Sequence, residues 1–114
     1  MFTVAWASLL SLDQTEEMEI PPFRLIPEPL TDDAAAVPPF RWASPEIGTR
    51  HRLGGEPAWV QAPEWPSCPS CEEPMTFYGQ LDSISDTINL ADCGMVYVFV
   101  CFGCFTTASL LQSG

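Results

Sequence analysis

The sequence predicts a small, mainly β domain, and three observations point to it. All twelve prolines lie at or before Pro74, so a proline-rich first part precedes a last part without proline. That last part contains short apolar runs, rich in Val, Phe and Tyr, that are typical of strands. Two Cys-x-x-Cys pairs border these runs. At 114 residues we expect a single domain, 1–114, with a proline-rich strand and wrap over 1–47 and a β module over 48–114.

The first residues, 2–12, predict an opening strand. Three of their apolar side chains share one face at a period of two, namely Phe2, Val4 and Trp6. A short helix over 5–18 is the alternative, because acidic residues follow the apolar ones.

The segment from Pro21 to Pro45 predicts an extended wrap over the surface of the domain. Its repeated prolines exclude a regular helix and a central strand. We expect Phe23, Phe40 and Trp42 to anchor it in grooves of the core. A fully disordered linker is the alternative, which the aromatic content disfavours.

Residues 48–61 predict a tight loop that leads into a short extended segment. Gly54 and Gly55 permit a positive φ or a close approach of another backbone. We expect Trp59 to pack inward and Val60 to face the other way.

The remaining segments predict three strands. Apolar and polar residues alternate over 75–80, which indicates a strand of about six to eight residues. Ser83–Cys93 is polar and typical of turns. Gly94–Cys101 is continuously apolar and β-branched, so we expect a strand buried on both faces, and Phe105–Gln112 is its expected return partner.

The two cysteine pairs, Cys68/Cys71 and Cys101/Cys104, carry the clearest chemical signal. Each has a two-residue gap that directs two sulfurs at one metal ion, and 29 residues between the pairs leave room for two strands. Four thiolates suit tetrahedral Zn²⁺ and leave no open coordination position, so the sequence predicts a structural zinc ribbon. Iron in a rubredoxin-like site is the main alternative, since both metals accept four sulfurs. A redox pair is disfavoured because neither pair begins a helix in a βαβ unit.

Four further expectations concern single residues. We expect Gly103 to adopt the left-handed conformation of the second cysteine turn. Backbone amides are expected to donate to the sulfurs, because 53–114 contains no Lys or Arg. Cys93 is expected to be a small residue at a turn, with replacement of a metal ligand as the alternative. His51 is expected at the surface or as a cap, with a role as catalytic base or ligand as the alternative.

The net charge of the chain narrows the range of functions that we expect. The formal net charge is −11, from 15 acidic residues against four arginines and no lysine, which argues against nucleic-acid binding. Every basic side chain lies in residues 1–52. The second half carries only acidic charges: Glu56, Glu64, Glu72, Glu73, Asp82, Asp86 and Asp92. Two interpretations follow, a monomer kept apart by self-repulsion or a surface that attracts a basic partner protein.

The number of cysteines and the N-terminal residues indicate the cellular compartment in which we expect the protein. Five cysteines are an odd number, and four belong to the metal pattern, so a disulfide-stapled secreted module is disfavoured. The apolar start lacks a positively charged region and becomes polar by Asp13, too soon for a membrane span. We therefore expect a cytoplasmic protein without membrane association. No set of catalytic residues can be assembled, so we expect no enzyme.

Several of these features occur together in known families. In order along the chain they are Leu53-Gly-Gly-Glu-Pro-Ala-Trp-Val-Gln61, Cys68-Pro-Ser-Cys71, Pro74-Met-Thr-Phe77, Gln80-Leu-Asp82 and Asp92-Cys-Gly-Met-Val-Tyr-Val-Phe-Val-Cys101. The combination resembles the bacterial YwqG-like domain family and is similar to the N-terminal part of the programmed cell death protein 2 family. It covers residues 48–112, and this chain departs from the family in its short length and in having a cysteine at Cys93.

The resemblance implies a β-rich fold and no catalysis. For the bacterial relatives it implies an immunity role beside toxins, and for the eukaryotic ones a chaperone role for a basic ribosomal protein. We therefore expect a non-enzymatic, zinc-stabilised module whose acidic surface neutralises a basic partner protein. A chaperone or escort of a basic client is the second expectation, and a small redox or iron-binding protein is the third.

Overall fold

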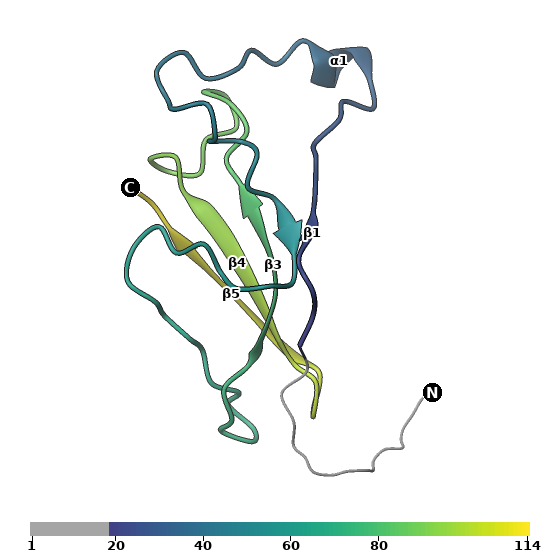
Figure 1. The fold of residues 1–114 in the computed structure, drawn as a ribbon, viewed down its shortest axis with the longest axis vertical. Helices are drawn as coiled ribbons and strands as arrows, with labels where there is room; N and C mark the ends of the chain where they lie inside the picture. Colours follow the sequence, from purple (N-terminus) through teal and green to yellow (C-terminus); the bar gives the residue numbers. More distant parts are fainter. Residues whose placement is uncertain (1–18) are drawn as a thin grey trace.

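The protein is built around one antiparallel sheet, as the computed structural model shows for residues 19–114 (Figure 1). The strands follow one another across the sheet in chain order, β1-β2-β3-β4-β5. The elements are β1 (Phe23–Arg24), α1 (Asp32–Ala35), β2 (Arg52–Leu53), β3 (Thr76–Asp82), β4 (Met95–Cys101) and β5 (Thr106–Gln112). The mainly β fold predicted from the sequence is therefore confirmed. The opening strand expected over 2–12, with its helical alternative, lies outside the described residues.

The two short strands attach the N-terminal segment to the sheet. Phe23 pairs with Leu53, and β2 in turn pairs with β3. At the end of β2 the chain of residues 20–21 lies directly against Gly54, where a Cβ would collide with the backbone oxygens of Ile20 and Pro21. Gly54 also has a φ of +74°, so glycine is required here on two counts. The close backbone approach predicted for this glycine pair is confirmed.

The proline-rich wrap differs from expectation in two respects. It contains one helical turn, α1, which begins where the Thr31 hydroxyl accepts a hydrogen bond from the Ala34 amide. The prediction of a wholly extended segment was therefore wrong, because a stretch free of proline follows the cap. Phe23 and Trp42 are 54% and 58% exposed, so neither is the core anchor that we expected. No helix among residues 19–114 is long and apolar enough to cross a membrane.

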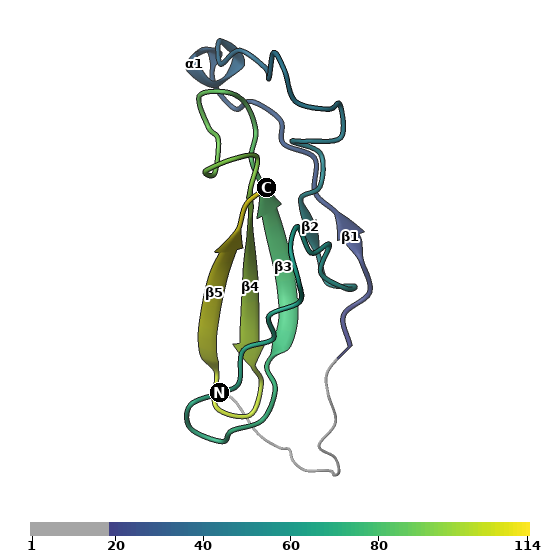
Figure 2. The same cartoon turned by 90° about the vertical axis from the view of Figure 1, so that its left-hand side faces the viewer.

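The three long strands, β3 to β5, form the main part of the sheet (Figure 2). A bulge between Phe77 and Gly79 shifts the register of β3, so that Gln80 faces the core together with Phe77. Along β4 the residues alternate between buried and half-buried. The expectation that β4 is buried on both faces was wrong, because only one face of the sheet is covered. The return strand expected over 105–112 is confirmed as β5.

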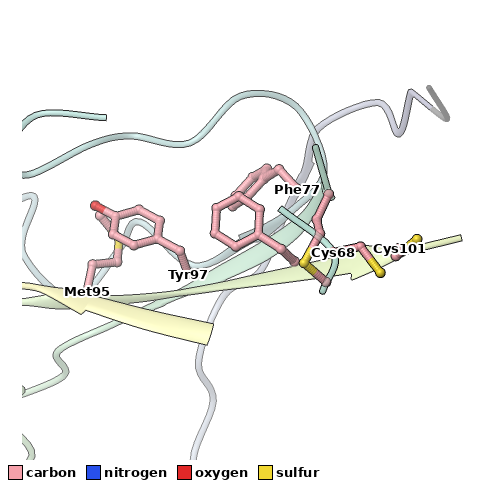
Figure 3. Packing of buried hydrophobic residues seen from close by; sticks show 7 residues of the cluster. Cys68, Phe77, Met95, Tyr97 and Cys101 are labelled. Atoms are coloured by element: carbon pink, nitrogen blue, oxygen red, sulfur yellow. The ribbon is translucent and has the colours of Figure 1, made fainter. Parts of the chain in front are cut away.

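The core lies on the covered face of the sheet. It consists of seven buried residues: Cys68, Met75, Phe77, Met95, Tyr97, Phe99 and Cys101. Figure 3 shows this cluster running from Met95 and Tyr97 to the two cysteines. Trp59 covers it, with ring centroids 4.9 Å from Tyr97 and 6.3 Å from Phe99, so the inward packing predicted for Trp59 is confirmed. Val60 also packs against the cluster, which corrects the prediction that it faces away.

Side chains of the sheet hold the covering segment, 58–62, by its backbone. The Tyr97 hydroxyl accepts from the Val60 amide at 3.0 Å and donates to the Ala58 carbonyl at 2.8 Å. Two buried glutamines supply the other bonds: Gln80 accepts from the Ala58 amide, and Gln112 accepts from the Gln61 amide and donates to the Ala62 carbonyl. These side chains thus replace the backbone partners that a neighbouring strand would provide.

Tyr97→Phe should destabilise the fold by about 1–3 kcal/mol, because it leaves the Val60 amide and the Ala58 carbonyl, both in half-buried residues, without a partner. Urea unfolding followed by tryptophan fluorescence measures the effect. Tyr78→Phe is the matched control, since Tyr78 is exposed and its hydroxyl makes none of these bonds. Equal stabilities for the two variants would show that the hydroxyl of Tyr97 does not hold the segment.

Candidate metal centre

Two similar turns position the four cysteines at one end of the sheet. The first turn precedes β3 and is closed by a bridge between Ser67 and Pro74, and the second is the loop between β4 and β5. Both lie at the end away from α1 and the C-terminus (Figure 1). We call them the first and the second knuckle.

The two knuckles share one backbone pattern. In the first, the Glu72 amide donates to the Cys68 carbonyl at 2.7 Å, and in the second the Phe105 amide donates to the Cys101 carbonyl at 2.6 Å. Glu72 and Phe105 both have positive φ, 65° and 56°. The left-handed residue is therefore the one after the second cysteine of each pair. The expectation that Gly103 takes this conformation was wrong.

The four sulfurs come together as the sequence predicted. Their ligand atoms all lie within 4.8 Å of one another. The shortest separations are 3.2 Å between Cys68 and Cys104, and 3.5 Å from Cys101 to both Cys71 and Cys104. A regular tetrahedron with zinc–sulfur bonds of about 2.3 Å has edges of about 3.8 Å, so a small expansion of the cluster accommodates the metal. All five cysteines are free, and no disulfide competes for these sulfurs.

Contacts between the sulfurs move the pKa values of three of the cysteines apart. The amide of Cys71, helped by the neighbouring Cys104 thiol, lowers the pKa of Cys68 to about 6. The proton is retained elsewhere in the cluster, because the contacts with Cys68 and then Cys101 raise the pKa of Cys104 to about 12. Four adjacent thiolates therefore need a divalent cation to offset their mutual repulsion. The donor set thus has the chemistry of a metal centre.

Hydrogen-bond donors around the sulfurs come mainly from the backbone. Amides of Cys71 and Ser70 face the Cys68 sulfur, and the amide of Glu73 faces that of Cys71. The Thr106 hydroxyl lies 3.8 Å from the Cys104 sulfur. Such donors orient thiolate ligands and reduce their charge density. The predicted reliance on backbone amides agrees with this arrangement.

One ligand of each pair belongs to the hydrophobic core. Cys68 and Cys101 are buried, whereas Cys71 and Cys104 are exposed. A metal bound here would therefore join the core to the surface turns. Four sulfurs fill a tetrahedral shell, so the arrangement suits a structural ion better than one that binds a substrate.

Two other residues considered as ligands lie elsewhere. Cys93 precedes β4, at the opposite end from Cys101, and is absent from the sulfur cluster. His51 is only 6% exposed, and its Nδ1 accepts from the Asp82 amide at 3.1 Å. The expected surface position of His51 was wrong, because its neighbour Arg50 pairs with the buried Asp82 carboxylate and draws the loop inward.

Comparison with known proteins gives one informative match. A protein of Salmonella typhimurium, described as "Uncharacterized protein YpfL", is 42% identical over 64 residues. The match covers 56% of this chain and 15% of the Salmonella protein, so the matched residues span a small part of that relative's length. No family model matches, and no solved structure matches. The resemblance to the YwqG-like and programmed cell death protein 2 families therefore stays a prediction.

Cys104→Ser should abolish metal binding and unfold the chain. Cys104 is exposed, so its replacement removes little packing and tests the metal directly. Structural zinc binds zinc-finger peptides with about 10–16 kcal/mol, which is as large as the whole net stability of a typical domain. Metal content by plasma mass spectrometry and far-UV circular dichroism, on protein purified without added metal, measure both effects.

Cys93→Ser is the matched control, because Cys93 is more buried than Cys104 but lies outside the cluster. It should keep one metal ion per chain and a nearly unchanged melting temperature. A folded, metal-free Cys104→Ser protein would contradict a stabilising metal. If the purified wild-type protein contains iron, the site is the rubredoxin-like alternative and not a zinc site.

Proposed function

We propose that the protein is a non-enzymatic, zinc-stabilised module that binds a basic partner protein. The observation that carries this proposal is the open face of the sheet, opposite the core. There Leu81, Val96 and Leu111 form one row across β3, β4 and β5. Leu81 and Leu111 are 49% and 50% exposed. An exposed apolar row of this kind is typical of a surface that another protein covers.

The same face continues towards the knuckles. Val98 and Val100 follow Val96 along β4 and are half-buried, and Tyr78 is exposed beside them on β3. Beyond the strands Phe105, in the second knuckle, is 74% exposed. Aromatic residues with an apolar ring are enriched at the centres of protein interfaces. We call the row and its extension the open face.

The charge of the surroundings supports a basic partner. Glu72 and Glu73 are exposed in the first knuckle, and Asp92 is exposed in the loop between β3 and β4. These two loops lie at opposite ends of the long strands, so negative charge flanks the open face at both ends. No basic residue occurs from Leu53 to Gly114, and four metal-bound thiolates would add further negative charge. An acidic rim around an apolar centre steers a basic protein to this face and opposes association of two copies.

Neutralisation of a basic toxin is the form of this function that we propose first. Such inhibition requires fast association, which electrostatic steering supplies. Cytoplasmic action is consistent with the five free cysteines, since thiols persist in a reducing compartment. The structural character of the four-sulfur shell supports a binding role over catalysis at the metal.

Capture from host extract at low and moderate salt, followed by mass spectrometry, should identify one basic protein, which is then purified and titrated. Leu81→Thr combined with Leu111→Thr should weaken its binding by about tenfold or more, since it removes the apolar centre of the face and keeps β-forming residues. Leu30→Thr is the control, because Leu30 is 96% exposed and lies outside the sheet. If the double variant binds the partner as tightly as the wild-type protein does, the open face is not the binding surface.

Glu72→Lys combined with Glu73→Lys tests the electrostatic part separately. It should lower the association rate with the purified partner by about tenfold at low salt and much less at high salt. Stopped-flow fluorescence measures the rate, and the melting temperature checks the fold. A partner that is acidic, or a rate insensitive to both salt and charge, would contradict a basic partner.

A further inference from the structure

A cavity at the edge of the sheet gathers most of the positive charge of this acidic protein. Its volume is about 360 Å³, and it lies beside β1 and β2, far from the cysteines in the sequence. The lining residues are Pro22, Arg24, Thr49, Arg50, His51 and Arg52. Three of the four arginines and the single histidine of the chain are among them. We call this the arginine cavity.

Two of these arginines face each other without a counter-charge among residues 19–114. Arg24 and Arg52 are direct partners in the antiparallel register of β1 and β2. Like charges at directly opposite positions destabilise a strand pair. An anion between or above the two guanidinium groups would therefore stabilise the pairing of β1 with β2. In the described part of the chain, the two ion pairs are Arg41 with Asp86 and Arg50 with Asp82, and neither involves Arg24 or Arg52.

The third arginine is held in a fixed position. Arg50 donates from Nε and Nη2 to the two carboxylate oxygens of Asp82, at 2.9 and 2.7 Å. The same carboxylate accepts from the amides of Gly48 and Arg50, at 2.7 and 3.0 Å. One carboxylate therefore neutralises one guanidinium, and two positive charges of the cavity are left over. The guanidinium of Arg50 cannot turn away without breaking this network.

The histidine adds a donor rather than an acceptor. Because Nδ1 of His51 accepts from the Asp82 amide, the proton of the neutral ring is on Nε2. Nε2 is buried and has no hydrogen-bond partner among the described residues. The Thr49 hydroxyl donates its proton to the Glu46 carbonyl at 2.7 Å, so only the acceptor capacity of its oxygen is left. The donors in and around the cavity that are unmatched within residues 19–114, on Arg24, Arg52 and His51, outnumber this single acceptor, which suits a ligand rich in acceptors.

We propose that the arginine cavity binds an oxyanion, the phosphate or carboxylate group of a small molecule, through Arg24 and Arg52 beside the fixed Arg50. Guanidinium groups bind both oxyanions through pairs of parallel hydrogen bonds. The volume is in the range of small-ligand sites and exceeds what inorganic phosphate alone fills, so the ligand carries an organic part. The net charge of −11 does not prevent binding, because salt at physiological strength screens charges beyond about 8 Å.

Titration of the full-length, metal-loaded chain with glycerol phosphate tests the proposal. Amide chemical shifts of residues 22–24 and 49–52 should change and saturate at constant ionic strength. Inorganic phosphate and acetate should act at the same residues more weakly, whereas glycerol and chloride should not. If acetate proves stronger than phosphate at equal concentration, the carboxylate is the source of the oxyanion. Shifts that do not saturate, or that chloride reproduces, would overturn the site.

Arg24→Gln and Arg52→Gln should each weaken glycerol phosphate binding by about tenfold or more. Arg41→Gln is the matched control, because Arg41 is equally basic, largely exposed and outside the cavity. Without ligand the double variant should melt at the same or a higher temperature, since the opposed charges are gone. A lower melting temperature with unchanged binding would assign the arginines a structural role and overturn the proposal.

The acidic residues that precede β1 in the sequence are the alternative source of the anion. Asp13→Asn combined with Glu16→Gln and Glu17→Gln should leave glycerol phosphate binding unchanged. Binding that occurs only in this triple variant would show that the chain's own carboxylates fill the cavity, and the ligand proposal would fail. None of these outcomes depends on the partner protein proposed above, because the open face and the arginine cavity share no residue.

Discussion

The convergence of four sulfurs at one end of the sheet is the constraint on which the rest of the structure depends. Cys101 is the last residue of β4, and Cys68 contacts the core just before β3, so a shared metal would fix where three strands begin and end. The two knuckles have the same backbone hydrogen bond and a left-handed residue at the same position, so they share one local backbone conformation. Of the two knuckles, Cys68 and Cys101 belong to the core, so a metal bound by all four sulfurs would tie both loops to it.

The need for this constraint follows from the thinness of the core. The core is a small cluster of seven buried residues, five on β3 and β4 and two, Cys68 and Met75, in the segment before β3. Its cover, 58–62, has no strand partners of its own. The sheet compensates with side-chain hydrogen bonds from Gln80, Tyr97 and Gln112 to the backbone of that cover. Such bonds contribute modestly when formed but are costly to leave unmade, so they define where the cover lies more than how stable it is. A metal ion held by the four cysteines would supply the stability that these bonds do not.

The sequence predicted the parts of the fold that depend on short-range chemistry. The cysteine spacing indicated the sulfur cluster, and β-branched and aromatic runs indicated β3, β4 and β5. The predictions that failed concern properties that depend on a residue's neighbours in the fold more than on the residue itself. A bulge turned Gln80 inward, and the position after the second cysteine, not the available glycine, took the left-handed conformation. The burial of His51 likewise depends on Asp82, which is thirty-one residues away in the sequence. No pattern in the sequence around His51 predicts that contact.

Charge separation along the chain becomes spatial separation in the fold. Three of the four arginines and the histidine cluster at the β1–β2 edge, while acidic loops lie at both ends of the long strands that carry the open face. If the positive groups were spread over the surface, each would cancel a nearby carboxylate, and neither an acidic rim nor a cationic cavity would exist. Only Arg50 is neutralised in this way within the cavity, by an aspartate that is itself buried. Two surfaces of opposite charge can therefore lie on a domain of one sheet, because screening confines each field to its own neighbourhood.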